Sequence, residues 1–166
     1  MERTIIAYIA GLIDGEGTIT IYKSVYGLKK GTLKCPQFCE KVMIGMNATK
    51  ENISVLKFIK ENFGGVLSIE KKIYSSPASI RRGIFASKPR VRYIAMTKVA
   101  VNLLKKIYPF LRIKKAQADV VFLLRKSINK TWERRRNQKS FSTLTLDSDT
   151  IEYREKLWEK IKAMHH

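Results

Sequence analysis

Alternating and helical periodicities divide the chain into predictable elements. Apolar and polar residues alternate with a period of two at 18–24 and 37–47, which predicts two strands that are each buried on one face. The same pattern predicts strands at 66–74 and 90–96. Apolar residues recur with helical spacing at 50–62, 98–108, 113–126 and 149–163. Thr49 is the expected N-cap of the first of these helices, and Asp147 or Ser148 that of the last.

An apolar helix also opens the chain and ends in the motif IAGLIDGEG, Ile9 to Gly17. Gly15 and Gly17 are expected to break this helix, which leaves Glu16 where the helix gives way to a strand. Four residues of mostly small side chain recur at helical spacing and share one face: Ala7, Ala10, Gly11 and Asp14. Packing of that face against a second copy would bring two acids together and suit metal binding. The alternative is a solvated turn acid, which the spacing alone leaves open.

The order of elements indicates an α+β fold: an αββαββα core with an antiparallel, four-stranded, saddle-shaped sheet, plus C-terminal helices. We expect the core to span residues 1–126, and residues 127–166 to form a basic helical extension of the same domain. The helices would cover one face of the sheet. The other face would carry polar and basic side chains, and it is interpreted either as a DNA platform or as the solvated face common in antiparallel sheets.

The net charge of the chain favours the DNA platform over a solvated face. Lys and Arg total 33 against 14 acids, a formal net charge of +19, and a dimer would carry twice that charge. Such a field indicates an anionic partner, and nucleic acid is the default one. No apolar run is long enough to span a membrane, and the N-terminus lacks the pattern of a signal peptide. We therefore expect no membrane partner and an intracellular location, in the cytoplasm or nucleoid or in an organelle. Cys35 and Cys39 form neither a zinc-site pattern nor a disulfide framework.

The motif resembles the signature of the LAGLIDADG homing endonucleases, with Ile9 in place of Leu and Gly15-Glu16 in place of Ala-Asp. The order of elements through Met96 is similar to the core of that family. The spacing of Lys98 before Pro109 and the stretch PFLRIKKAQA at 109–118 are also similar to that family. The resemblance covers about residues 8–125. Because one copy of the motif is present, the chain is similar to the homodimeric branch of the family.

The resemblance implies a site-specific DNA endonuclease that hydrolyses both strands of a long pseudo-palindromic site. Glu16 and the Gly15 carbonyl would bind Mg²⁺, with two or more metal ions per dimer, and Lys98 and Asn47 would assist catalysis. Asp14 would complete the helix end. The dimer interface would be formed by Ala7, Ala10, Gly11 and Asp14. The expected DNA-contacting residues are Thr20, Tyr22, Ser24, Lys29, Lys30, Lys41, Lys72, Arg81, Arg82, Arg90, Arg92, Lys114, Lys115, Arg134, Arg135 and Arg136.

Two alternatives remain open. One is a non-cleaving DNA- or RNA-binding protein on the same scaffold, such as a regulator or an intron maturase, for which intron RNA would be a partner. Loss of the acid at position 16 would mark that class, and this chain keeps Glu16. The other is a basic ribosomal or RNA-packaging protein, which would explain the charge but give Glu16 no role.

Overall fold

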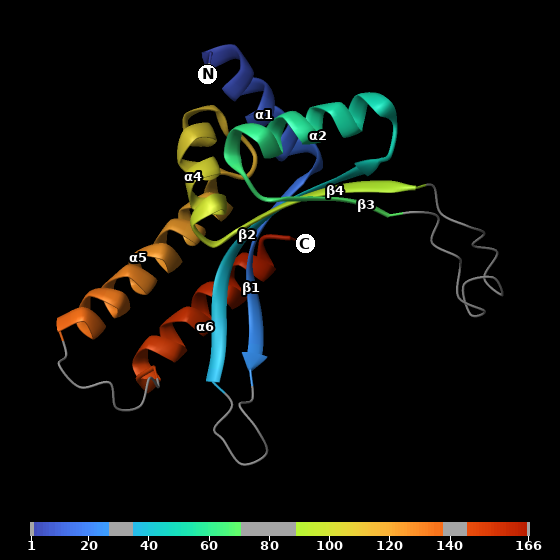
Figure 1. Cartoon of the computed structure of the whole chain (residues 1–166). Coiled ribbons are helices and arrows are strands. Elements are labelled where there is room, and N and C mark those ends of the chain that lie inside the picture. Colours follow the sequence, from blue (N-terminus) through green and yellow to red (C-terminus); the bar gives the residue numbers. More distant parts are fainter. Residues whose placement is uncertain (1, 27–34, 71–88, 138–145, 166) are drawn as a thin grey trace, which may run out of the picture.

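A computed structural model describes residues 2–26, 35–70, 89–137 and 146–165 (Figure 1). The chain begins with helix α1 (Arg3–Glu16), strands β1 (Gly17–Tyr26) and β2 (Cys35–Asn47) and helix α2 (Lys50–Phe63). Strands β3 (Val66–Glu70) and β4 (Arg90–Met96) follow, then helix α4 (Thr97–Ile107), the 3₁₀ turn η1 (Tyr108–Phe110) and helices α5 (Lys115–Asn137) and α6 (Ser148–Ala163). The predicted α+β fold is confirmed.

The four strands form one antiparallel sheet in the order β1-β2-β4-β3. The β1–β2 pair runs downward in Figure 1 while β3 and β4 run to the right, so the sheet is strongly curved. Strand alternation sorts the side chains by face. The helix-covered face carries the buried residues Ile19, Ile21, Val42, Ile44, Val91, Tyr93 and Ala95. The opposite face is here called the outward face. None of the described helices crosses it, and its side chains remain partly exposed.

The α2–β3 connection depends on glycine. Gly64 ends α2 with φ 80°, and Gly65 follows with φ 96°, both in the left-handed region. A Cβ atom on Gly65 would lie 2.8 Å from the Ile94 carbonyl oxygen, so only glycine permits this approach to β4. The hydroxyl of buried Tyr93 donates a hydrogen bond to the Gly64 carbonyl at 2.9 Å. Burial raises the pKa of Tyr93 to about 12, so the hydroxyl stays protonated as a donor.

Two boundaries differ from the sequence-based expectation. Gly15 does not break α1, which continues to Glu16 before β1 begins at Gly17. Helix α5 continues to Asn137, well beyond the predicted end at residue 126, so the expected boundary between core and extension falls inside one helix. Apolar periodicity fades after that residue, but the Lys, Arg and Glu residues that follow have high helix propensity and continue the helix.

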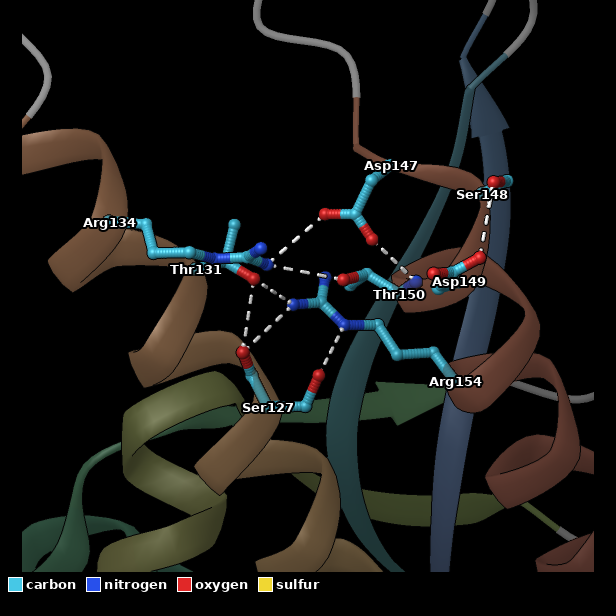
Figure 2. Close-up of polar contacts among 8 residues, drawn as sticks. All are labelled: Ser127, Thr131, Arg134, Asp147, Ser148, Asp149, Thr150 and Arg154. Atoms are coloured by element: carbon cyan, nitrogen blue, oxygen red, sulfur yellow. Dashed lines mark hydrogen bonds and ion pairs between the residues drawn. The ribbon is translucent and has the colours of Figure 1, made fainter.

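A polar junction joins α5 to α6 (Figure 2). The Arg154 side chain is 5% exposed, and it donates hydrogen bonds to the Ser127 hydroxyl at 3.0 Å, the Ser127 carbonyl at 3.2 Å and the Thr131 hydroxyl at 2.8 Å. Asp147 caps α6 by accepting from the Thr150 N–H at 2.7 Å. The same carboxylate accepts from Arg134 on α5 at 3.1 Å. These contacts fix the C-terminal helix on the body of the protein.

The other side of α6 is attached to the β1–β2 pair. Lys23 of β1 forms an ion pair with Glu155 of α6, and its ammonium lies 4.7 Å from the centroid of the Trp158 ring. Leu157 and Ile161 are buried in the core beneath these contacts. Helix α6 therefore supports the strand pair from the helix-covered side. Within the described ranges, no helix is both long and apolar enough to cross a lipid bilayer.

The junction of α1 with β1 provides a test of the packing. A Cβ atom at Gly17 would lie 2.7 Å from the Ile13 carbonyl oxygen and 2.8 Å from the Ile13 Cα, both backbone atoms that cannot rotate away. We expect Gly17→Ala to lower the free energy of unfolding by about 2 kcal/mol, as overpacking does elsewhere. Gly45→Ala is the control, because its nearest neighbour would be the Arg92 Cγ at 3.8 Å. Urea unfolding of both variants checks this, and equal stabilities would contradict it.

Candidate functional site

The motif at the end of α1 contains two acids with different surroundings. Asp14 is 9% exposed, and both of its carboxylate oxygens accept hydrogen bonds from backbone amides. The Arg112 N–H donates at 2.7 Å and the Lys114 N–H at 2.9 Å. The segment after η1 is therefore attached to the end of α1 across about a hundred residues of sequence. With both oxygens occupied in this way, Asp14 is a structural acid.

Lys114 completes the same attachment from its side chain. Its ammonium donates to the carbonyls of Ile13 at 2.9 Å and Asp14 at 2.5 Å, both in the last turn of α1. The Ile13 carbonyl also accepts from the Gly17 N–H that closes the helix, and the partial negative charge of carbonyls at a helix C-terminus favours a cation there. Burial lowers the pKa of Lys114, while the negative charges of Asp14 and Glu16 act in the opposite direction. Lys114, expected only as a DNA contact, is thus the lysine whose amino group lies at the acidic turn.

Glu16 differs from Asp14 in being exposed at the last residue of α1. Within the described part of the chain, its carboxylate forms no hydrogen bond or ion pair. Gly15 beside it is also exposed, with open space where a side chain would stand. The turn therefore presents one carboxylate that is free to bind a ligand.

Asn47 ends β2 on the outward face. Gly17, the residue after Glu16, pairs with Ile44, which is three residues before Asn47 on the same strand. The Asn47 side chain is exposed, and its backbone carbonyl accepts from the Asn52 side-chain amide at 2.9 Å. The carbonyl contact fixes the backbone here and leaves the Asn47 amide group available.

Lys98 is placed differently. It is exposed in the first turn of α4, directly after β4. The preceding Met96 pairs with Lys41, which is four residues along β2 from Gly45. Among the residues that the structure describes, Lys98 has no hydrogen bond or ion pair with the motif turn. Its catalytic role remains a prediction, whereas the contacts of Lys114 identify a second lysine that sequence reasoning did not assign to this turn.

The four residues predicted for the dimer interface differ in exposure within the protomer. Ala10 is fully buried within its own protomer, and Asp14 is bonded as described above, so neither offers surface to a second copy. Ala7 is half-buried and Gly11 is exposed. The exposed residues of α1 recur instead at Thr4, Tyr8, Gly11 and Gly15. Ile9 and Ile13 are buried in the core, and so are the adjacent residues Ala10 and Asp14. The exposed face of α1 is therefore rotated by part of a turn from the predicted one.

One protomer supplies few side chains that could bind a metal ion. No group of three or more His, Cys, Asp or Glu side chains in the described ranges could enclose a metal ion. Glu16 and the Gly15 carbonyl are hard oxygen ligands of the kind that Mg²⁺ prefers, and Mg²⁺ commonly takes one or two carboxylates with water and phosphate as its other ligands. The residues present therefore fit a magnesium site that is completed from outside the protomer.

The outward face carries many of the expected DNA contacts. Thr20, Tyr22, Ser24, Lys41, Arg90 and Arg92 all project there. The Lys41 ammonium lies 5.7 Å from the centroid of the Tyr22 ring, and Arg92 forms an ion pair with Glu70. Glu70 is a functional candidate that alternation places on this face but that a search for basic residues overlooks.

The remaining expected contacts lie elsewhere or outside the described residues. Lys115 and Arg136 are exposed on α5, and Arg134 is bonded to the N-terminus of α6. The Lys115 ammonium lies 4.8 Å from the centroid of the Tyr108 ring. Outside the described residues lie Lys29, Lys30, Lys72, Arg81, Arg82 and the side chain of Arg135.

Solved structures with the same architecture identify the fold. The homing endonuclease I-CvuI in complex with its target superposes with a TM-score of 0.63 and 17% identity, covering 96% of this chain and 80% of that one. The group I intron-encoded homing endonuclease I-CeuI, complexed with DNA, gives 0.58 and 13%, covering 96% and 67%. The archaeal intron-encoded homing endonuclease I-Vdi141I, also complexed with DNA, gives 0.54 and 18%, covering 98% and 99%.

The chain therefore has the fold of the LAGLIDADG homing endonucleases, as the motif predicted. The fold is shared at low sequence identity. Neither a protein-family model nor a curated protein matches the sequence. I-CvuI was crystallised with DNA in the presence of Ca and, in another crystal, of Mg, in which the DNA was not cleaved.

Removing the charge of each motif acid should affect stability to different extents. Asp14→Asn replaces one acceptor oxygen by an amide donor that faces a backbone N–H, so we expect it to lower the free energy of unfolding by about 2–3 kcal/mol. Glu16→Gln should change it by less than about 0.5 kcal/mol, because this side chain is exposed. Thermal and urea unfolding measure both. A destabilised Glu16→Gln, or an unaffected Asp14→Asn, would reverse the assignment of roles.

Proposed function

We propose that the protein is a site-specific DNA endonuclease that acts as a homodimer with Mg²⁺ and makes a double-strand break at a long pseudo-palindromic site. The observation that carries this proposal is the exposed carboxylate of Glu16, at the edge of an open, basic sheet face, in a fold shared with DNA-bound homing endonucleases. A DNA substrate implies that the protein acts inside a cell.

The metal ligands would be the Glu16 carboxylate and the Gly15 carbonyl of each protomer, with two or more ions per dimer. When bound, Mg²⁺ would neutralise charge on the scissile phosphate and on the attacking and leaving oxygens. The fit is supported by the exposure of both residues and by the structural bonding of Asp14, which leaves Glu16 as the one uncommitted carboxylate of the motif.

Other residues of the chain would position the reactants. The Asn47 amide can hold a water molecule by hydrogen bonds at the outward face. The Lys114 ammonium is attached to the carbonyls before Glu16, so it would add fixed positive charge beside the phosphate that is cut. Lys98 remains a candidate for stabilising charge in the transition state or for binding a neighbouring phosphate.

Dimerisation would use the exposed face of α1. Gly11 and Gly15 are separated by one helical turn and have no side chain, so a second α1 could approach closely there, with half-buried Ala7 and exposed Tyr8 at the margin. A two-fold axis beside this face would bring the two Glu16 carboxylates together and would predict a site with related half-sites. The outward faces of both protomers would then form one continuous basic surface.

Cleavage tests the enzyme assignment. A binding site would first be selected from a pool of randomised DNA duplexes in Ca²⁺, and the enriched duplexes would then be incubated with Mg²⁺. We expect double-strand cuts by the wild type, and a loss of at least about a hundredfold in rate for Glu16→Gln with binding retained. Glu133→Gln, a matched charge change on the exposed side of α5, should cut normally. Binding without cuts would indicate a regulator, and a preference for RNA would indicate an RNA-binding protein.

The α1 face is tested by Gly11→Leu. Within the protomer nothing lies within 4 Å of a Cβ atom at this position, so the variant should fold with wild-type stability or slightly better. A leucine would prevent the close approach of a second helix, so we expect sedimentation to show monomers where the wild type shows dimers. Asn102→Leu, an exposed position in α4, is the control. A wild type that sediments as a monomer, or a dimeric Gly11→Leu, would refute this interface.

A further inference from the structure

The outward face of the sheet is basic, but it carries one acidic side chain, that of Glu70. Among the described strand residues that project to the outward face, Glu70 is the only acidic one, and it shares that face with Lys41, Arg90 and Arg92. If this face binds DNA, as proposed above, the Glu70 carboxylate is repelled by the phosphates. Its presence therefore calls for a compensating role.

The carboxylate contacts one particular arginine. Glu70 Oε1 lies 2.7 Å from Arg92 Nη1 across the β3–β4 pair. The two side chains are 29% and 36% exposed, and the Glu70 Oε2 atom is buried without a hydrogen-bond donor among the described residues. A partly exposed ion pair contributes little to stability, and a buried unpaired oxygen reduces that contribution further. Stability is thus a weak explanation for the pair.

The surroundings leave room for Arg92 to lie along the sheet. Its neighbours in register are Gly45 on β2, which has no side chain, and Ser68 on β3, which has a small one. The Arg92 Cγ would lie 3.8 Å from a Cβ atom at Gly45. The side chain therefore occupies a slot between two small residues, and Glu70 holds its far end.

The ion pair also determines which part of the guanidinium is available. With Nη1 bonded to Glu70, the Nε and Nη2 groups make no hydrogen bond to any described residue. These two groups form one edge of a rigid planar fork. Two parallel donors of this kind match the O6 and N7 acceptors that guanine presents in the major groove.

We propose that Glu70 is a positioning residue that holds Arg92 in a fixed plane, so that Arg92 reads one guanine in each half-site. The inference rests on the proposed function, because it requires DNA on the outward face. Glu70 does not contact the base. Its negative charge lowers the overall affinity for DNA, and its contact with Arg92 increases the preference for one base. A free Arg92 would bind any nearby phosphate or base edge, whereas a held Arg92 binds one base well.

The test compares base preferences. Wild type, Glu70→Gln, Arg92→Ala and the double variant would each select from randomised duplexes in Ca²⁺, and the enriched pools would be sequenced. For the wild type we expect about tenfold preference for guanine at one position per half-site. Glu70→Gln should reduce that preference to less than about threefold, leave the other positions unchanged and tighten binding to random DNA by about twofold. Arg92→Ala should lose the same position, and the double variant should lose nothing more.

Glu61→Gln is the matched control, because it removes the same charge from an exposed site on α2 and should leave every base preference unchanged. Glu70→Ser repeats the test if thermal melting shows that Glu70→Gln is misfolded. A retained guanine preference in the Glu70 variants, or a uniform loss at all positions, would overturn the inference and leave the endonuclease assignment intact. If the wild type enriches no sequence, the proposed function fails, and this inference fails with it.

Discussion

The arrangement of the candidate site depends on the bonds that Asp14 forms with the backbone of residues 112 and 114. A buried carboxylate that accepts two amide hydrogen bonds, with a lysine ammonium on the carbonyls beside it, joins the first helix to the segment after η1. This attachment determines where α1 stops. It also determines that the next acid, Glu16, is exposed at the start of the sheet, because the residue directly after it, Gly17, packs against Ile13.

Two acids separated by one residue thus have separate roles because their surroundings differ. Asp14 is surrounded by donors of its own chain, and Glu16 by solvent. The same division applies to the small residues of α1. Ala10 serves the internal core, while Gly11 and Gly15 remain on the surface. Helical geometry puts neighbouring residues on different faces, and tertiary packing then decides which face is buried in the protomer and which remains available to a ligand or a second copy.

Much of the fold could be predicted from local pattern. Alternation located the strands because Ile19, Ile21, Val42 and Ile44 are buried on one face, and the caps at Thr49 and Asp147 were recognisable because side-chain capping acts within one turn. The free face of α1 could not be predicted, since small residues follow two adjacent helical stripes and only tertiary packing selects between them. The end of α5 was missed because its last turns lack apolar periodicity.

The unpredicted parts of the site share one cause, which is distance along the sequence. Lys114 reaches the motif turn from about a hundred residues away, and Arg92 meets Glu70 through the register of two strands. A motif identifies candidate residues only within its own span, and Glu16 is the exposed acid within this one. It carries no information on which lysine folds back onto that turn.

The one-sided sheet has a consequence for how such a protein can diversify. Side chains on the helix-covered face hold the molecule together, while those on the outward face contribute little to its core, although both kinds alternate along the same strands. Mutations at alternate positions are therefore subject to nearly independent selection. Substitution of Thr20, Tyr22 or Lys41 can therefore change what the outward face binds without first requiring a more stable core. Along each strand, we expect related sequences to vary at the outward positions and to be conserved at the buried positions between them.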